Sequence, residues 1–372
     1  MITVVAGTRP NFMKIAPILR ALAARKAPFR LVHTGQHFDA AMSDVFFRDL
    51  GMPVPDVRLT AGGGSHAEQT ASVLVGVEKE LMANRPDAIV VVGDVTSTVA
   101  SAMSAAKLGI PVVHVEAGLR SRDWNMPEEI NRVLTDQLSD LLLTPSHDAA
   151  PNLRAEGIAD ERIVFVGNVM IDSLHYAKDR PTDALARFDV TPGAFALATL
   201  HRPANVDARE PFERTLDALA AIATRVPLLF PVHPRTVARA ASFGLEARLR
   251  GIPGLRLTEP IGYNDFVTLM QAAKLVATDS GGIQEETTAL GVPCLTMREG
   301  TERPITVTEG TNTVVALDAA RIAQEVDAIV QGRPKRGRVP EGWDGRAGER
   351  IADAVLRLVA GTPPPKTAGP RA

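Results

Sequence analysis

The sequence has little of several residue types, and each shortage excludes a class of protein. A single cysteine, Cys294, among 372 residues excludes an internal disulfide and a cysteine-based zinc site. Aromatic residues make up 4% of the chain, which argues against stacking platforms for single-stranded nucleic acid. The formal net charge is −2, so the basic excess of a general nucleic-acid or anionic-membrane binder is missing. We therefore expect no nucleic-acid partner.

Long hydrophobic runs are also missing. No apolar stretch reaches the roughly 18 residues that a membrane span needs. Residues 1–6 are apolar but lead directly into Gly7-Thr8-Arg9-Pro10, with no basic segment before them and no room for the apolar region of a signal peptide. We expect a cytoplasmic protein without a membrane partner, in which Cys294 is a reduced thiol.

What the sequence does contain is an ordinary globular mixture, 45% hydrophobic and 23% charged, arranged as short apolar runs between longer amphipathic stretches. This alternation predicts βαβ units and parallel sheets. The predicted strands are 2–6, 30–34, 88–92, 112–115, 141–144, 163–166, 195–199, 228–232, 255–257, 275–278 and 294–297. The predicted helices include 12–24, 98–108, 131–138, 212–224, 265–273 and 346–358.

So many strands exceed one comfortable doubly wound sheet, so we predict an α/β chain with two sheets. The joint is expected near residues 167–183, where the pattern becomes polar. The expected organisation is a first domain at 1–170, a second domain at 171–345, a C-terminal helix at 346–360 that returns to the first domain, and a disordered tail at 361–372.

Three carboxylates follow predicted strands or open a helix in the first half. Asp94, Glu116 and Glu128 are candidates for acid or base chemistry, because parallel α/β sheets bind ligands at the carboxyl ends of their strands. Each also has an ordinary interpretation. Asp94 could cap the following helix, and Glu128 could be part of a normal helix start at Pro127. Glu116 could be held in a structural ion pair with Arg120 or Arg122.

Cations and glycines in both halves suggest a phosphate-bearing ligand. Arg9 and Lys14 follow the first strand and could face a phosphate, or be solvated cations of a turn. In the second half, His201 is an acid or base candidate or a loop brace, and Arg303 is an anion clamp or a solvated side chain.

The segment from Thr278 to Glu286 is the most informative of these. Ser280, Gly281 and Gly282 open a predicted helix, whose free N–H groups and positive dipole end suit a diphosphate, and Glu286 could reach a ribose diol. The alternative is an ordinary glycine-rich turn. The segment is neither a GxGxxG fingerprint nor a Walker A loop, so neither NAD nor a hydrolysed triphosphate is indicated. Spacing for metal ligands is nearly absent: His33 and His37 form one HxxxH pair across a strand end.

In this order and spacing, the motifs resemble the non-hydrolysing UDP-N-acetylglucosamine 2-epimerase family, from Gly7 to about Thr311. The segments that carry the resemblance are Gly7-Thr8-Arg9-Pro10, Thr34-Gly35-Gln36-His37, Gly93-Asp94, His114-Val115-Glu116-Ala117-Gly118-Leu119-Arg120, Pro127-Glu128-Glu129-Ile130-Asn131-Arg132, His201-Arg202, Asp279-Ser280-Gly281-Gly282 with Gln284-Glu285-Glu286, and Glu302-Arg303-Pro304. One departure is Pro203-Ala204-Asn205, where the family often has Arg-Glu-Asn.

The resemblance implies a GT-B architecture of two Rossmann-like domains facing a cleft. It implies reversible conversion of UDP-GlcNAc to UDP-ManNAc by elimination of UDP to 2-acetamidoglucal and re-addition, for cell-surface polysaccharide biosynthesis. It further implies a homodimer that needs no metal, nicotinamide or other cofactor.

The resemblance also assigns residues. Asp94, Glu116, Glu128 and His201 match the catalytic positions, and Gln36 and His37 lie near a second, activating UDP-GlcNAc site of bacterial members. The UDP-sugar positions are Arg9, Lys14, Phe266, Ser280, Gly281, Gly282, Glu286 and Arg303.

Three other functions remain open from the sequence. A hydrolysing 2-epimerase would release free ManNAc and UDP from the same intermediate. A GT-B glycosyltransferase would share the diphosphate site but gives no reason for three carboxylates. A nucleotide-sugar sensor would not need acid or base groups at all.

Overall fold

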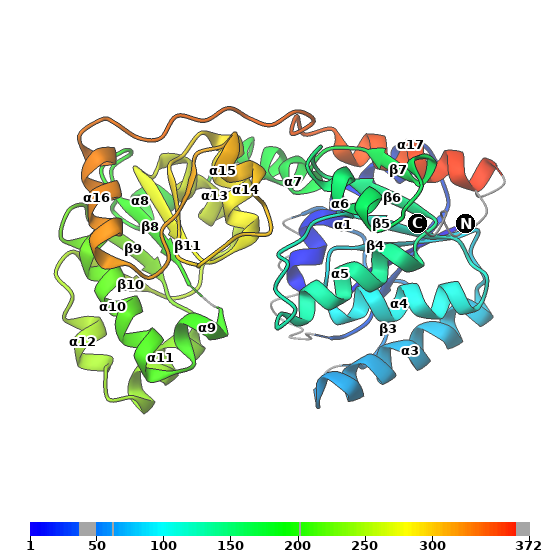
Figure 1. Ribbon diagram of the computed structural model, residues 1–372, viewed down its shortest axis with the longest axis horizontal. Coiled ribbons are helices and arrows are strands. Elements are labelled where there is room, and N and C mark those ends of the chain that lie inside the picture. The colour runs from blue at the N-terminus through cyan, green and yellow to red at the C-terminus, as the bar shows by residue number, and fades with distance from the viewer. Residues whose placement is uncertain (37–49, 62, 201, 362–372) are drawn as a thin grey trace. The chain divides into compact units, whose positions relative to one another are not determined.

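The computed structural model describes residues 1–36, 50–61, 63–200 and 202–361 of the chain. Two residues singled out above, His37 and His201, lie outside the described residues, as does the tail expected at 361–372 from residue 362 onward. Arg9 is described only in its backbone. The chain divides into two compact units (Figure 1). Unit 1 comprises Met1–Tyr176 and the segment that begins at Glu341, and unit 2 comprises Ala177–Pro340. Within the described residues, no helix is both long and apolar enough to span a bilayer.

Unit 1 contains a parallel sheet in the order β3-β2-β1-β4-β5-β6-β7. Its strands are β1 (Ile2–Ala6), β2 (Phe29–His33), β3 (Val57–Arg58), β4 (Ala88–Val92), β5 (Val112–Val115), β6 (Leu141–Thr144) and β7 (Ile163–Phe165). Its helices are α1 (Arg9–Ala24), α3 (His66–Ala83), α4 (Thr96–Lys107), α5 (Pro127–Leu138), α6 (Ala149–Ala155), η1 (Asp160–Arg162), α7 (Val169–Lys178), which contains the unit boundary, and α17 (Ala347–Ala360). The central strands are buried along their whole length, which is why they are apolar without alternation.

The strand order fixes which helices share a face of this sheet. The chain moves in one direction from β1 through α1 to β2, and in the opposite direction through α3, α4 and α5. Because such crossovers are right-handed, α1 lies on one face and the other three helices on the other. The contacts agree, since α4 packs against both α3 and α5, and α17 packs on α1.

Unit 2 contains a second parallel sheet, in the order β10-β9-β8-β11-β12-β13. Its strands are β8 (Ala196–Thr199), β9 (Leu228–Pro231), β10 (Leu255–Thr258), β11 (Leu275–Thr278), β12 (Cys294–Thr296) and β13 (Asn312–Val314). Its helices are α8 (Ala184–Arg187), α9 (Pro203–Val206), α10 (Arg209–Ala223), α11 (Pro234–Ser242), α12 (Glu246–Arg250), α13 (Tyr263–Ala272), α14 (Gly281–Leu290), α15 (Ile305–Thr308) and α16 (Ala319–Val330). Its core includes Phe212 and Phe230, both fully buried.

Each sheet therefore has a point at which the direction of winding reverses. In unit 1 it lies between β1 and β4, and in unit 2 between β8 and β11. Ligands of open α/β sheets bind outside the carboxyl ends of the strands at such points. The turns that follow these four strands carry Gly7, Asp94, Arg202 and Asp279, all from the motifs singled out in the sequence.

Candidate active site

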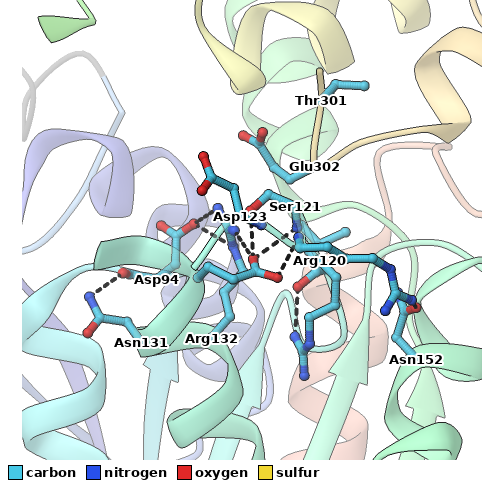
Figure 2. A network of polar contacts seen from close by, with 12 residues as sticks. Asp94, Arg120, Ser121, Asp123, Asn131, Arg132, Asn152, Thr301 and Glu302 are labelled. Atoms are coloured by element: carbon cyan, nitrogen blue, oxygen red, sulfur yellow. Dashed lines mark hydrogen bonds and ion pairs between the residues drawn. The ribbon is translucent and has the colours of Figure 1, made fainter. Parts of the chain in front are cut away.

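Asp94 follows β4 at the reversal point of unit 1. It is not the cap of α4, because the N-cap is Val95. Its carboxylate is held from α5 instead: Oδ2 accepts hydrogen bonds from Arg132 Nε at 2.9 Å and from Arg132 Nη2 at 2.6 Å. Asn131 also donates to the Asp94 carbonyl at 2.8 Å (Figure 2). Two consecutive residues of one helix thus fix both the backbone and the side chain of Asp94.

Arg132 is a bridge, because its third nitrogen, Nη1, lies 2.6 Å from the carboxylate of Glu129. Glu129 is buried, which would raise its pKa, but the N–H groups of Ser121 and Arg122 and the Arg132 guanidinium lower that pKa below its usual value. The ionised Glu129 therefore holds the loop after β5 against α5. Arg132 and Glu129 were not predicted as functional residues, although both lie in the motif around Glu128.

Glu116 directly follows β5 and pairs with Lys14 of α1. Both residues are buried. The expectation of Arg120 or Arg122 as partner is wrong, because Arg120 pairs with Asp136 and Glu156. Glu116 has a positive φ of 73°, which is uncommon for a residue with a side chain. The ion pair offsets the cost of burying this carboxylate.

Gly93 lies against this ion pair. Its φ is +70°, and a Cβ there would be 3.2 Å from Lys14 Nζ and 3.3 Å from Glu116 Oε2. Glycine at this position therefore lets the β4 turn approach both charged groups while adopting a left-handed backbone.

Glu128 lies in the first turn of α5, directly after Pro127, as an ordinary helix start predicts. It is half-buried, and its carboxylate has no hydrogen-bond or ion-pair partner among the described residues. Because residues four apart share a helix face, Glu128 lies on the same face as Arg132, which contacts Asp94. The fold therefore gathers Asp94, Glu116 and Glu128 at one end of one sheet, each with a different electrostatic environment.

Gln36 has a local partner in unit 1. Its Oε1 accepts hydrogen bonds from the backbone N–H of Ser97 at 3.0 Å and from its hydroxyl at 2.7 Å, at the start of α4. A Cβ on Gly7 would lie 2.6 Å from Ser97 Cβ, so the first turn packs closely on the same helix start. Gln36 therefore connects the end of β2 to the turn that carries Asp94.

In unit 2, Asp279 connects the two turns at the reversal point. Its Oδ2 accepts hydrogen bonds from the N–H of Arg202 at 2.9 Å and from Asn205 Nδ2 at 3.1 Å. The next residue, Ser280, is the N-cap of α14 and makes no side-chain cap, so the first N–H groups of α14 are not capped by this side chain. Such a helix start is electropositive and suits an anion.

Arg303 lies beside the start of α14. Its Nε is 2.8 Å from Glu285 Oε1, and its Nη1 donates to Glu302 Oε1 at 2.6 Å. Burial would raise the pKa of Glu302, but Arg303, Arg298 and Arg202 hold it well below its usual range. Gly281 lets the guanidinium approach the start of α14, since a Cβ there would lie 2.3 Å from Arg303 Nη1. Arg303 is thus a buried member of a charged network and not a solvated loop residue.

Glu286 is fully buried in α14 and accepts a hydrogen bond from the hydroxyl of Tyr263 at 2.6 Å. Burial raises the pKa of Glu286 to about 7, the Tyr263 hydroxyl lowers it in part, and Glu285 raises it further. Phe266, one turn after Tyr263 on α13, is half-buried. No group of three or more His, Cys, Asp or Glu side chains in the described part of the chain is arranged to hold a metal ion.

Comparison with known proteins identifies the family. The family model described as UDP-N-acetylglucosamine 2-epimerase matches residues 20–356. The UDP-N-acetylglucosamine 2-epimerase of Methanocaldococcus jannaschii is 40% identical over 357 residues, which cover 94% of this chain and 97% of that protein. The UDP-2,3-diacetamido-2,3-dideoxy-D-glucuronate 2-epimerase of Pseudomonas aeruginosa is 39% identical over 367 residues, which cover 96% of this chain and 99% of that protein.

Solved structures agree. The M. jannaschii UDP-GlcNAc 2-epimerase in complex with UDP-GlcNAc and UDP superposes with a TM-score of 0.89 at 39% identity, covering 96% of this chain and 99% of that one. The Neisseria meningitidis enzyme bound to UDP-GlcNAc gives 0.86 at 28% identity, with 96% and 99% covered. The two parallel sheets with their helices are thus GT-B-like, as the family resemblance implied. The chain belongs to the UDP-N-acetylglucosamine 2-epimerase family.

Proposed function

We propose that this chain inverts C2 of a UDP-linked 2-acetamido sugar, UDP-GlcNAc or a close derivative, reversibly and without releasing the free sugar. The observation that carries the proposal is the gathering of Asp94, Glu116 and Glu128 at the carboxyl end of the unit 1 sheet, next to the cations Lys14 and Arg132. A binding protein has no use for three acidic side chains there, and a glycosyltransferase would need only one base for its acceptor. The related structures with UDP-GlcNAc or UDP bound support a nucleotide-sugar ligand.

The proposed reaction has two half-steps. A carboxylate removes the C2 proton while the C1–O bond to UDP breaks, so that a C1=C2 double bond forms and UDP leaves with the bonding electrons. UDP then attacks C1 again, and a second acid group delivers a proton to the opposite face of C2. General acid–base catalysis requires each group to be within hydrogen-bond reach of the proton that it moves.

The residues divide into two roles. Asp94, Glu116 and Glu128 are the proposed acid and base groups, with His201 as a catalytic or phosphate-stabilising partner. The charge on departing UDP needs preorganised donors. For this we propose Arg9, Lys14, the start of α14 at Ser280, Gly281 and Gly282, and Arg303, with Glu286 on the ribose and Phe266 near the uracil.

Incubation with UDP-GlcNAc in D2O, followed by NMR, tests the reaction. We expect deuterium at C2 of both UDP-GlcNAc and UDP-ManNAc. Free ManNAc would show a hydrolysing enzyme instead. Unchanged UDP-GlcNAc, with turnover of the 2,3-diacetamido uronate in a parallel tube, would reassign the sugar to the class of the Pseudomonas relative. No turnover of either sugar would contradict the proposed activity.

The Asp94→Asn variant tests the site. It should bind UDP with unchanged affinity by calorimetry and lose nearly all turnover. Asp123→Asn is the matched control, because Asp123 is exposed and contacts Asn125 within its own loop. Normal turnover of Asp94→Asn would remove Asp94 from the mechanism.

Three further features stay predictions: a homodimer, a cytoplasmic location and a role in polysaccharide biosynthesis. Activation by a second UDP-GlcNAc near Gln36 and His37 is a further prediction, and a sigmoidal dependence of rate on UDP-GlcNAc concentration would support it.

A further inference from the structure

His114 lies in the middle of the unit 1 sheet, on β5, and is 1% exposed. Each of its ring nitrogens faces an oxygen atom. Nδ1 is 2.6 Å from Asp136 Oδ1, and Nε2 is 2.9 Å from the carbonyl oxygen of Gly93. His114 has none of the catalytic or UDP-binding roles proposed above, although it opens one of the segments that carry the family resemblance.

The two oxygen atoms determine which protons the ring carries. The Gly93 carbonyl can only accept a hydrogen bond. Asp136 is completely buried, which would raise its pKa, but His114 and Arg120 lower that pKa below its usual value, so this carboxylate is ionised and also only accepts. Its second oxygen already receives hydrogen bonds from Gly118 N at 3.1 Å and Arg120 Nη2 at 2.7 Å.

A neutral histidine carries a proton on one ring nitrogen only. In either tautomer, a lone pair of the ring would then point at a lone pair of oxygen across less than 3 Å. Only a ring with protons on both nitrogens makes two favourable contacts. A charged ring would also be balanced: Arg120 donates to Glu156 at 2.8 and 2.6 Å as well as to Asp136, so two cations would face two carboxylates.

The position of the ring gives this charge a use. Gly93 has its left-handed backbone at the end of β4, its N–H donates to the Val115 carbonyl at 3.0 Å, and the next residue is Asp94. On the other side, Asp136 holds the N–H of Gly118, two residues after Glu116. The His114–Asp136 pair therefore links the turn that carries Asp94 to the turn that carries Glu116.

We propose that His114 is a positioning residue, a doubly protonated ring that fixes the Gly93 carbonyl and thereby the direction of Asp94. The protonation state follows from the two contacts of the ring and the charge of Asp136, whereas the effect on turnover rests on the proposed function. The two parts have separate tests.

NMR of protein labelled with [15N]histidine tests the protonation state. The chain has eight histidines, and the His114→Gln variant assigns the signal. We expect both ring nitrogens of His114 at protonated shifts at pH 7.5. One protonated and one unprotonated nitrogen would overturn the proposal.

Asp136→Asn is the matched variant, because its amide can replace every contact. Its oxygen can accept from Gly118 and Arg120, and its NH2 can donate to Nδ1 of a neutral ring that keeps the Gly93 hydrogen bond. We expect one protonated nitrogen in this variant. A ring that remains doubly protonated would show that Asp136 does not set its charge.

Measurements of kcat and KM with the UDP-sugar that the protein turns over test the positioning role. In His114→Leu the Gly93 carbonyl loses its donor, so we expect kcat to fall at least about tenfold while KM changes by less than about twofold. His114→Gln retains an N–H donor and should recover part of kcat. His33→Gln is the control, since His33 is another buried strand histidine of unit 1.

Three kinetic results would overturn the role: wild-type kcat in His114→Leu, a fall no larger than in His33→Gln, or no difference between the Leu and Gln variants. Should His114→Leu fail to fold, the comparison of His114→Gln with His33→Gln decides. If wild-type protein turns over no UDP-sugar, the proposed function fails, while the NMR result still decides the state of the ring.

Discussion

Lys14 and Glu116 form a buried ion pair across 102 positions of the sequence, between the first helix of unit 1 and the end of β5. The pair lies against Gly93, beside Asp94. A candidate UDP-binding cation and a candidate catalytic carboxylate are thus partners of each other, and substitution of one changes the environment of the other.

A double-mutant cycle on this pair should show strong coupling. Lys14→Met leaves a carboxylate buried without its cation, which typically costs about 3–5 kcal/mol, whereas the double variant Lys14→Met/Glu116→Gln buries no charge and should recover much of that loss. Urea unfolding followed by tryptophan fluorescence measures this, because both tryptophans, Trp124 and Trp343, belong to unit 1. The exposed pair Arg154–Asp160 is the control, for which removal of the charge should cost less than about 1 kcal/mol. Additive effects at Lys14 and Glu116 would contradict the coupling.

Arg132 should be irreplaceable by lysine. Three of its nitrogens contact two different carboxylates, on Asp94 and Glu129, and a lysine ammonium cannot reproduce this planar geometry. We expect Arg132→Lys to reduce kcat by about 10²-fold, as misplacement of a catalytic group by about 1 Å does. Arg25→Lys, at a pair with Asp353 on α17, is the control and should keep wild-type kcat. Equal kcat in Arg132→Lys and wild type would show that the guanidinium does not orient Asp94.

Much of the fold could be predicted from local pattern. The strands at Ile2–Ala6, Ala88–Val92 and Leu275–Thr278 were predicted with their observed bounds, because runs buried on both faces are apolar and end at polar turns. Two edge strands, β3 and β13, were missed. They have two and three residues, too few to show a pattern. Helix α5 was predicted four residues late, since its acidic first turn carries no apolar periodicity.

In the candidate site, too, the features that depend on local sequence could be predicted, and the contacts between distant segments could not. Polar residues after strands marked Asp94, Glu116 and the start of α14, because that position depends only on the local sequence. Their partners depend on how distant segments meet: the sequence offered Arg120 for Glu116, and the fold supplies Lys14. One feature of the sequence could have marked Arg132 as a residue of the site. It lies four positions after Glu128 on a helix, which places both on one face.

The substitution Gly281→Ala should weaken UDP binding. A Cβ at this position would lie 2.3 Å from Arg303 Nη1 and 2.7 Å from Glu302 Oε1, so the guanidinium would have to move from the start of α14. We expect the affinity for UDP, measured by calorimetry, to fall at least about tenfold, equivalent to about 1.4 kcal/mol. Gly300→Ala is the control, because a Cβ there meets nothing within 4 Å. Unchanged UDP affinity in Gly281→Ala would show that Arg303 does not bind the diphosphate.

Glu286 should make unit 2 less stable as the pH rises. Its pKa is raised to about 7 by burial and by Glu285, against the Tyr263 hydrogen bond, while an unfolded glutamate titrates near 4.5. A carboxyl group with a raised pKa in the folded state favours folding when protonated, so its contribution is present at about pH 4.5 and lost as the pH passes 7. The shift corresponds to about 3 kcal/mol.

We therefore expect the free energy of unfolding in urea, followed by circular dichroism, to fall by about this amount between pH 5 and pH 8 relative to Glu286→Gln, which keeps the contact with Tyr263 but does not titrate. Using the difference between the two proteins removes the contribution of Asp172, whose pKa burial also raises, to about 6, but which is present in both. Parallel pH profiles for the two proteins would mean that Glu286 is already ionised in the folded state and ready to accept hydrogen bonds from a ribose diol.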